Sequence, residues 1–393
     1  MNNIPITKPF FTGEESSQMQ QVLDSGWVTQ GPMVARFEQA FRDFSKSAHA
    51  LAVTSCTTAL HLALKALGIQ EGDEVIVPSF TFTASANVVE HCGARPVFAD
   101  IDLATFNIDP RGIEALITPR TKALMPVHLF GLAADMDPIL ALAEKYALSV
   151  VEDAACGFDA WYKNRHVGTF GDVGCFSFHP RKAITTGEGG MVITENEKLA
   201  ERIRSLRDHG AMTSDLQRHL GNRPYVMPEI VEPGYNYRMT DIQAALGVSQ
   251  MNNAKEIQHR RRDVAGRYDD ALRGNPWLVT PVCPQGYIHG CQSYVCLFAP
   301  ERITLQNVEK IHAGRNAFMD HLQARGIATR PGTQAVHILE YYRKTYGIQP
   351  EDLPNSLMAY MCSVTLPLYA HMSDDEFGYV MNTLQEFDPS CAA

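Results

Sequence analysis

The chain has 393 residues, of which 45% are hydrophobic and 20% are charged, and its formal net charge is −10 at pH 7. This length allows two domains, and the composition is ordinary for a globular protein without low-complexity segments. The negative charge argues against a nucleic-acid backbone as the main partner, but it leaves room for a local basic pocket.

Nine cysteines are scattered through the chain, and an odd number without paired spacing indicates neither a disulfide framework nor a metal site. We therefore expect reduced thiols, no metal and a cytoplasmic location. No apolar run approaches the length of a membrane helix, and residues 1–5 show no signal-peptide pattern. We accordingly expect no membrane association.

Residues 14–45 predict two helices joined by a turn at Gly31-Pro32. The connection over residues 25–32, SGWVTQGP, carries an aromatic side chain and hydroxyls. Such a loop serves either as the lip of a ligand site or as a plain connector, and on its own the segment favours the connector.

Strands and helices alternate from residue 50 onwards. The expected strands are 51–53, 74–77, 96–99, 122–127 and 148–151, and the helices between them are 59–67, 83–92, 111–117 and 134–146. Regular alternation predicts an α/β fold with a mainly parallel sheet sandwiched by helices. Such sheets bind ligands at the carboxyl ends of their strands.

Two of these strand ends carry polar residues. The first continues into Thr54-Ser-Cys-Thr-Thr58 at the start of a helix, where hydroxyls and free N–H groups either cap the helix or bind an anion such as phosphate. Asp153 ends another strand, and it either caps the following segment or faces a positive group. The residues alone leave both alternatives open at each end.

Lys182 lies in the segment 174–190, between predicted strands over 173–178 and 191–194. The segment closes in a glycine-rich turn at its end. A lysine on a rigid turn beside buried strands is poorly solvated, which favours the neutral, nucleophilic amine. Most loop lysines are solvated surface residues. The surroundings of Lys182 must therefore decide whether it is a surface residue or a nucleophile.

The pattern changes beyond residue 195. A helix over 197–208 precedes a looser stretch, 210–235, typical of an ordered excursion at an interface. We place the domain boundary in a long helix predicted over 241–270. The two domains are then residues 1–245, large and α/β, and residues 246–393, smaller and α+β. The smaller domain has strands near 277–281 and 292–299 and helices near 306–325 and 374–387.

A hydroxyl-rich helix start, an aromatic loop, a strand-end carboxylate and an embedded lysine are the groups that pyridoxal 5′-phosphate requires. The phosphate needs N–H groups, the ring an apolar or aromatic face, the pyridinium nitrogen an acid and the aldehyde an amine. With Asp153 at the ring nitrogen, the ring withdraws electrons from the reacting carbon and Lys182 transfers its proton. The order of these groups is that of fold-type I enzymes.

Over nearly its whole length the chain resembles the DegT/StrS-type sugar aminotransferases, which act on nucleotide-linked keto-sugars. The segments that carry the resemblance are residues 25–32, 152–155, 167–172, 176–190, 234–245 and 366–369. The resemblance implies a pyridoxal-phosphate enzyme of fold type I.

The resemblance also implies contacts to the cofactor ring. Lys182 matches the Schiff-base lysine, Asp153 the partner of the pyridinium nitrogen and Phe82 the aromatic stacked on the ring. Cys156 stands where many members have Gln or His near the ring oxygen, and because a thiol is a weaker partner it is either a weak contact or a packing residue. A branch of the family with His in place of the lysine dehydrates its substrate, and the presence of Lys182 argues against that branch.

Contacts to the cofactor phosphate follow from the same resemblance. Thr57 and Thr58 match its phosphate turn, and Ser177 matches a further phosphate ligand. Asn236 matches an asparagine that reaches the cofactor phosphate of the neighbouring subunit. The resemblance therefore implies a homodimer with shared active sites.

Residues 184–190 and 236–239 are similar to the group of the family that aminates C4 of the sugar. We expect L-glutamate to give its amino group to the cofactor, which passes it to a nucleotide-linked 4-keto-6-deoxy sugar for lipopolysaccharide or another glycan. Thr29, Arg238 and His337 are the candidate sugar contacts, with His337 equally interpretable as a core histidine.

Two alternatives stay open. One is another enzyme, a sugar C3 aminotransferase or a cyclitol aminotransferase. The other is a non-catalytic regulator that binds pyridoxal phosphate, and the presence of both Lys182 and Asp153 weighs against it.

Overall fold

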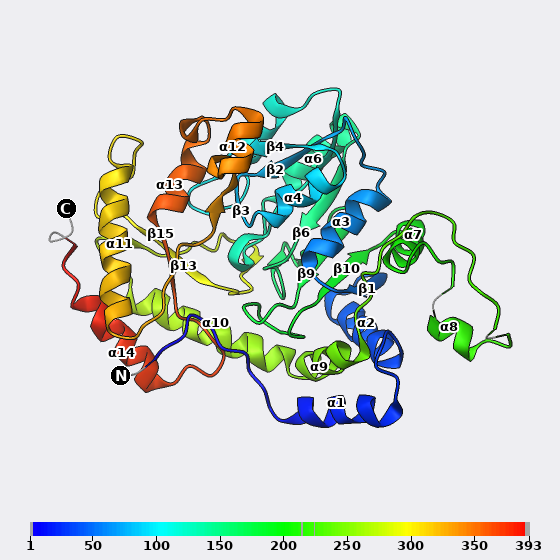
Figure 1. Ribbon diagram of the computed structural model, residues 1–393. Helices are drawn as coiled ribbons and strands as arrows, with labels where there is room; N and C mark the ends of the chain where they lie inside the picture. The colour runs from blue at the N-terminus through cyan, green and yellow to red at the C-terminus, as the bar shows by residue number, and fades with distance from the viewer. Residues whose placement is uncertain (1–2, 214, 224, 390–393) are drawn as a thin grey trace.

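The computed structural model describes residues 3–213, 215–223 and 225–389 and is built around a seven-stranded sheet (Figure 1). Its strands, in spatial order, are β1 (His49–Val53), β10 (Gly190–Thr194), β9 (Val173–Ser177), β6 (Ser149–Asp153), β5 (Thr121–Leu124), β2 (Glu74–Pro78) and β4 (Arg95–Ala99). Neighbours are parallel except at β10, which runs antiparallel to β1 and β9. The predicted mainly parallel sheet is confirmed.

Helices cover both faces of this sheet. One face is packed by α2 (Pro32–Ser45), α6 (Met136–Tyr146) and α9 (Asp241–Asn252), and the other by α3 (Cys56–Ala66), α4 (Ala84–His91) and α7 (Glu197–Arg207). Side chains alternate along each strand, so that Ala52 of β1 belongs to the first layer and Val53 to the second. The α/β sandwich expected from the sequence is therefore present.

The N-terminal helices form where they were predicted. Helix α1 (Glu14–Ser25) ends at Gly26, whose φ of 71° suits the left-handed conformation that glycine adopts without strain. Helix α2 then begins with Pro32, which has no N–H to leave unpaired at a first helical position. The buried Asp241 carboxylate also accepts the N–H of Gly31, at 2.8 Å, and ties this start to α9.

An arm, defined here as residues 209–235, leaves the body after α7 (Figure 1). It contains the short helix α8 (Asp215–Leu220), which the sequence analysis did not predict. Exposed apolar side chains lie along it, including Met212, Leu220, Tyr225 and Met227. The interface expected for this stretch stays a prediction, and exposed apolar side chains are typical of such a surface.

The long helix predicted over 241–270 is two helices, α9 and α10 (Ala254–Ala271), separated at Asn253. Asn253 has φ −100° and ψ 2°, and its side-chain amide donates to the carbonyl of Ser249, which ends the first helix. Early residues of α10 pack on the large sheet, whereas Val264 and later ones pack on the C-terminal core. The division at residue 245 stays a prediction.

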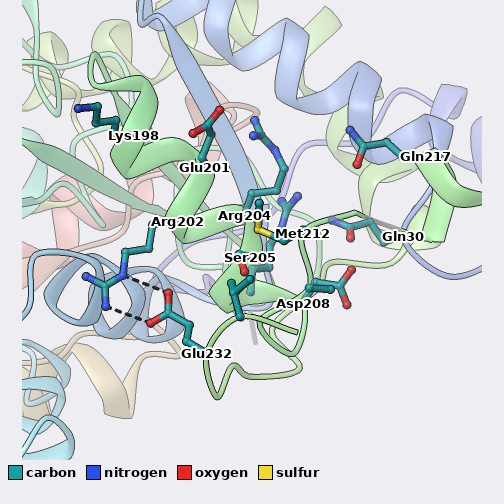
Figure 2. A pocket seen from close by; sticks show the side chains of 13 residues that line it. Gln30, Lys198, Glu201, Arg202, Arg204, Ser205, Asp208, Met212, Gln217 and Glu232 are labelled. Atoms are coloured by element: carbon teal, nitrogen blue, oxygen red, sulfur yellow. Dashed lines mark hydrogen bonds and ion pairs between the residues drawn. The ribbon is translucent and has the colours of Figure 1, made fainter. Parts of the chain in front are cut away.

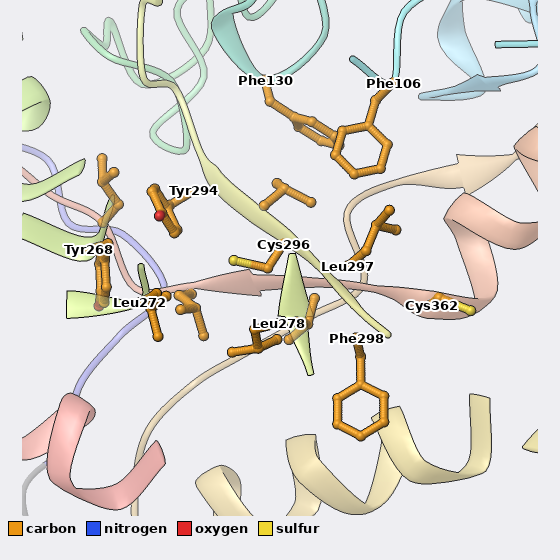
Figure 3. Close-up of a cluster of buried hydrophobic side chains, with 14 of the residues drawn as sticks. Phe106, Phe130, Tyr268, Leu272, Leu278, Tyr294, Cys296, Leu297, Phe298 and Cys362 are labelled. Carbon is orange, nitrogen blue, oxygen red and sulfur yellow. The ribbon is translucent and has the colours of Figure 1, made fainter. Parts of the chain in front are cut away.

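The C-terminal part has its own three-stranded antiparallel sheet, β11-β13-β15. Its elements are β11 (Leu278–Val279), β13 (Tyr294–Phe298), α11 (Val308–Ala324), α12 (Glu340–Tyr346), α13 (Pro354–Cys362), β15 (Ser363–Leu366) and α14 (Asp374–Gln385). Figure 3 shows its core, in which Tyr268 of α10 lies beside Tyr294 of β13 and Phe106 and Phe130 reach in from the large unit. The N-terminal Ile4 also belongs to this core and pairs with Ile327.

Short elements complete the chain. They are β3 (Phe80–Thr81), α5 (Pro110–Ile113), η1 (Glu114–Leu116), η2 (Leu129–Gly131), β7 (Trp161–Tyr162), β8 (Arg165–His166), β12 (Tyr287–Ile288), β14 (Gln334–Ala335), η3 (Val336–Ile338) and η4 (Pro350–Asp352). Of the nine cysteines, Cys391 lies outside the described residues and the other eight are free thiols. In the described ranges no helix combines the length and the apolar character needed to cross a membrane.

Candidate active site

A cavity of about 340 Å³, called here the Lys182 cavity, lies at the carboxyl ends of β1, β6 and β9. Strand register brings these ends together, because Asp153 lies opposite Cys175 and Gly190 lies opposite both Ser177 and Val53. The predicted site residues that line the cavity are Thr57, Phe82, Asp153, Cys156, Ser177 and Lys182. The structure therefore assembles residues that are far apart in the chain.

Lys182 lies on a tight loop between β9 and β10. Its backbone N–H donates to the carbonyl of His179 at 2.8 Å, and Phe178 closes the loop by donating to Gly189 at 2.9 Å. The Nζ atom lies 3.1 Å from Cys156 Sγ. Because both ends of the loop belong to paired strands, the amine is held at a defined place on the cavity wall.

Asp153 is only 4% exposed, and its carboxylate is held from two sides. Ser85 Oγ donates to Oδ2 at 2.7 Å, and the N–H of Ala155 donates to Oδ1 at 3.1 Å. The capping role considered for Asp153 is thus present, yet no cation of the described residues forms an ion pair with it. A carboxylate buried without a cation is costly, and a pyridinium N–H supplies the missing positive charge.

The two hydroxyls expected to bind phosphate have different surroundings. Ser55 is the N-cap of α3, and Thr58 completes the capping box, accepting the N–H of Ser55 at 3.0 Å and donating to its carbonyl at 2.8 Å. Thr57 lines the cavity, but Thr58 does not. Direct contact of Thr58 with phosphate stays a prediction, and its hydroxyl is engaged in the cap.

The strand β10 approaches this turn unusually closely at Gly190. A Cβ added to Gly190 would lie 2.4 Å from the carbonyl carbon of Ser55 and 2.7 Å from the nitrogen of Cys56. Only glycine allows this approach, which places the N–H groups of the first turn of α3 beside Ser177. These groups form a cradle for a phosphate at a helix N-terminus.

Two thiols at this edge stay protonated. Burial, with a further contribution from Asp153, raises the pKa of Cys56 and that of Cys175 well above the usual range for a thiol. Cys56 Sγ lies 3.9 Å from Asp153 Oδ1. Neither thiol therefore adds a second negative charge beside the carboxylate.

The sequence analysis missed several residues that line the cavity, among them Arg181, Gln292 and Arg330. Burial, and then the positive charge of Arg181, lowers the pKa of Arg330. The Nε atom of Arg330 is buried and has no partner in the part of the chain that the structure describes. Arg181 follows a proline in the lysine loop, whereas Arg330 and Gln292 come from the C-terminal part, where no local pattern marks them.

Gln292 links the C-terminal part to the lysine loop. Its Nε2 donates to the carbonyl of Arg181 at 2.8 Å, directly before Lys182. The carbonyls of Cys291 and Gln292 accept hydrogen bonds from the buried Arg261 of α10. The lysine loop is therefore supported by both units.

Three predicted residues lie away from the Lys182 cavity. Arg238 pairs with Asp208 at 2.5 Å, and Asn236 bridges to the backbone of Asp208. Thr29 is exposed, and its carbonyl accepts the N–H of Asp241. The loop of residues 25–32 lies against α8, where the rings of Trp27 and His219 are 5.1 Å apart.

Asp208, the partner of Arg238 and Asn236, lines a second cavity of about 470 Å³, called here the Asp208 cavity. It is lined by Gln30, by helix α7 and by the arm, with Asp208 at its wall (Figure 2). The cavity is larger than the Lys182 cavity, but it holds neither a lysine beside a strand end nor a buried carboxylate without a cation. Within the described chain the Lys182 cavity is the candidate active site.

His337 is a core residue, so its interpretation as a sugar contact is wrong for this cavity. Its side chain is fully buried and does not line the Lys182 cavity. Nδ1 lies 2.5 Å from Ser79 Oγ, and Nε2 lies 3.0 Å from the carbonyl of Pro350. Both ring nitrogens are therefore satisfied by the protein, which is the alternative that the sequence left open.

The donor set of the Lys182 cavity fits pyridoxal phosphate. Lys182 offers an amine, Asp153 an uncompensated carboxylate, Phe82 a ring that is 63% exposed, and the start of α3 an anion cradle. In the described ranges no three His, Cys, Asp or Glu side chains are grouped so that they would hold a metal ion.

Known proteins to which the chain is similar include aminotransferases, in agreement with a site for pyridoxal phosphate. Residues 10–385 match the DegT/DnrJ/EryC1/StrS aminotransferase family. The chain is 42% identical to the spore coat polysaccharide biosynthesis protein SpsC of Bacillus subtilis, over 98% of this chain and 96% of that protein.

Solved structures are also similar. One is the putative sugar aminotransferase Spr1654 from Streptococcus pneumoniae in its PMP form, with a TM-score of 0.89, 30% identity and coverage of 97% of this chain and 98% of that one. Another is DesV of S. venezuelae in complex with a ketimine intermediate, with a TM-score of 0.86, 31% identity and coverage of 98% of each chain.

Proposed function

The chain belongs to the DegT/DnrJ/EryC1/StrS aminotransferase family and is a pyridoxal-phosphate-dependent sugar aminotransferase, and from this premise we propose that it aminates C4 of a nucleotide-linked 4-keto-6-deoxy sugar with L-glutamate as donor. The observation that carries the proposal is the placement of Lys182 in one cavity with Asp153 and the start of α3. The C4 position rests on the resemblance of residues 184–190 and 236–239.

Pyridoxal phosphate, when bound, supplies a carbonyl group that carries the amino group and a ring that withdraws electrons from the reacting carbon. Lys182 is the group that anchors the cofactor and moves the proton at that carbon. Asp153 keeps the ring nitrogen protonated, and Ser85 and Ala155 hold its carboxylate in place. Phe82 covers one face of the ring, and Ser177 and Thr57 hold the phosphate.

The positive charges in the cavity fit the anionic parts of the substrates. Arg181 and Arg330 line the Lys182 cavity, and neither forms an ion pair within the described residues. A guanidinium binds a carboxylate or phosphate through parallel hydrogen bonds. We assign Arg330, whose buried Nε has no partner among the described residues, to the carboxylate of the amino donor.

The proposal includes a homodimer in which each chain completes the site of its partner. Asn236, Arg238 and Thr29 lie outside the Lys182 cavity of their own chain, and the apolar side chains of the arm are exposed. Burial of such a surface against a second copy is favourable. Asn236 then reaches the cofactor phosphate of the partner, and Arg238 and Thr29 contact the sugar nucleotide.

The product is proposed to enter a surface polysaccharide. The support is the identity of 42% to a spore coat polysaccharide biosynthesis protein. Lipopolysaccharide is the second destination that we propose.

The reaction is tested with purified protein, pyridoxal phosphate, L-glutamate and a panel of GDP-, UDP- and dTDP-linked 4-keto and 3-keto sugars together with a cyclitol ketone. We expect NMR spectra of the product to show a new amine at C4. The Lys182→Ala variant should lack the absorbance near the visible edge and should lose activity by at least about 10³-fold, because it lacks both anchor and proton carrier.

The matched control is Lys122→Ala, which removes an exposed lysine on β5 and should leave turnover unchanged. An amine at C3 would move the assignment to the C3 group, and turnover of cyclitol ketones alone would move it to cyclitol aminotransferases. Normal turnover by Lys182→Ala would show the site to be wrong. A protein that binds the cofactor but does not exchange it with glutamate would be a regulator.

A further inference from the structure

Cys156 has no role in the proposed reaction, yet it is the side chain in contact with the lysine amine. Its Sγ atom lies 3.1 Å from Lys182 Nζ, and both residues line the Lys182 cavity. Both are half-buried, so small molecules that enter the cavity reach them. A thiol and a primary amine at this separation are two nucleophiles that one oxidation step can join.

The surroundings favour oxidation at Cys156 over the other thiols at this edge of the sheet. Cysteines that react with peroxide lie in accessible, positively charged places. Arg181, Arg330 and Lys182 line the same cavity as Cys156. Cys56 lines this cavity as well, but it is buried like Cys175, and the pKa values of both thiols are raised, so they remain protonated and less reactive.

We propose that Cys156 is a peroxide-sensitive modification site that becomes bonded to Lys182 through a sulfur–nitrogen link. In the first step the thiol is oxidised by hydrogen peroxide to a sulfenic acid and releases one water. In the second step Nζ attacks the sulfur, the hydroxyl leaves with a proton as water, and an S–N bond forms. The sulfur is oxidised once, the peroxide is reduced, and the pair of side chains loses two hydrogen atoms.

The link requires a free amine at Lys182. Nζ already faces Sγ, and the lysine side chain shortens the remaining separation by rotation about its methylene bonds. When the amine is engaged with pyridoxal phosphate it is not available to the sulfur. Bound cofactor therefore protects Cys156 and Lys182 from forming the link. That oxidation removes the anchor of the cofactor rests on the proposed function.

The test treats the full-length protein with hydrogen peroxide, once stripped of cofactor and once loaded with pyridoxal phosphate, and analyses protease digests by mass spectrometry. In the stripped protein we expect the Cys156 and Lys182 peptides to be joined and to weigh two hydrogens less than their sum. The joined species should disappear after dithiothreitol. Its yield should fall at least about tenfold in the loaded protein.

Three variants decide the assignment. Cys156→Ser should abolish the link, and Lys182→Arg should leave a sulfenic acid at Cys156 that dimedone traps. Cys283→Ser, which removes an exposed thiol elsewhere, should retain the link. Sulfinic acid at Cys156 without a link, or an unchanged Cys156 beside an oxidised Cys283, would overturn the proposal.

This readout is separate from the reaction itself. It is a mass measured on cofactor-free protein, so it gives the same answer if the sugar substrate or the donor is assigned wrongly. Conversely, normal C4 amination together with absence of the link would retain the proposed function and reject only the modification site.

Discussion

The Lys182 cavity and the Asp208 cavity are built from the same chain in different ways. The first is assembled from strand ends that a rigid sheet holds in register, and it contains Lys182 and Asp153, the proposed anchor and charge partner of the cofactor. The second lies between α7 and the arm, and its wall includes Asp208, the partner of Asn236 and Arg238. One chain thus brings together the residues proposed to bind the cofactor, whereas the other predicted site residues, Asn236, Arg238 and Thr29, lie on another surface of the same chain.

The largest expected effect is the recovery of aminotransferase activity when two inactive variants, one altered at each surface, are mixed so that their subunits exchange. Lys182→Ala and Asn236→Asp chains should each be nearly inactive, the second because a carboxylate repels the cofactor phosphate. If Asn236 acts on the partner, mixed dimers hold one intact site, and an equal mixture should regain about a quarter of wild-type activity. The measurement is aminotransferase activity after subunit exchange.

Mixing Lys182→Ala with Asp153→Asn is the matched control. Both residues line one cavity of one chain, so no mixed dimer holds an intact site and activity should not return. Recovery in this control, or none in the first mixture, would contradict the division of roles between the two surfaces.

A smaller effect separates two neighbouring hydroxyls within the Lys182 cavity. Thr57→Val should weaken binding of pyridoxal phosphate by about tenfold, because a hydrogen bond to a charged group is lost. Thr58→Val should instead lower the free energy of unfolding of the cofactor-free protein by about 1 kcal/mol, because the side-chain half of the α3 capping box that Thr58 supplies is lost. Absorbance titration measures the first quantity, and urea unfolding measures the second.

The reverse assignment would appear as an unchanged cofactor affinity in Thr57→Val together with a reduced one in Thr58→Val. That result would place phosphate binding on the capping hydroxyl. It would also show that the cap opens when the cofactor binds.

The smallest effect is a loss of stability in mild acid. Burial lowers the pKa of His166 from 6.5 to about 4, and His166 packs against Phe176 of β9, the strand that ends at Ser177 of the Lys182 cavity. As the pH falls below 6.5 the unfolded chain binds a proton that the folded chain refuses until about pH 4. The free energy of unfolding should therefore fall by on the order of 1 kcal/mol between about pH 8 and pH 6.

Urea unfolding of the cofactor-free protein at the two pH values measures this change. His166→Asn, which keeps a polar side chain but does not titrate, should reduce the pH dependence. Burial also lowers the pKa of His61, beside Tyr237 and the Asn236 segment, to about 4. An unchanged pH dependence in His166→Asn, with a reduced one in His61→Asn, would show that His61 beside the Asn236 segment, and not His166, causes the loss of stability in acid.

The sequence predicted the sheet and the residues at its strand ends because each is marked by its neighbours in the chain. Lys182 and Asp153 follow or end an apolar run, and the geometry of a parallel sheet brings such ends together. Ser177 was expected at the site only because of the family resemblance. Helices α1 and α2 were predicted separately over residues 14–45, before the alternation of strands and helices begins at residue 50. The local sequence pattern was therefore sufficient to predict the wall of the cavity that carries Lys182.

Residues supplied by distant parts of the chain could not be predicted in this way. Ser85 has the pattern of an ordinary helix residue, and only the fold brings its hydroxyl to Asp153. Arg330 follows no strand pattern, and its neighbour in the cavity is Arg181. His337 was equally interpretable as a sugar contact and as a core histidine, because nothing local reveals that Ser79 lies against its ring. The break at Asn253 was hidden because helical periodicity continues on both sides.

The single antiparallel strand of the large sheet has a consequence for how the protein folds. Strand β9, the lysine loop and β10 are consecutive, so their pairing closes a short loop, whereas His49 of β1 must find Thr194 across a long stretch of chain. Contacts between distant residues form slowly. The lysine loop is therefore expected to form early, and the phosphate cradle beside Gly190 only after β1 has docked. Tight binding of the cofactor should therefore appear only after the slow pairing of β1 with β10 is complete.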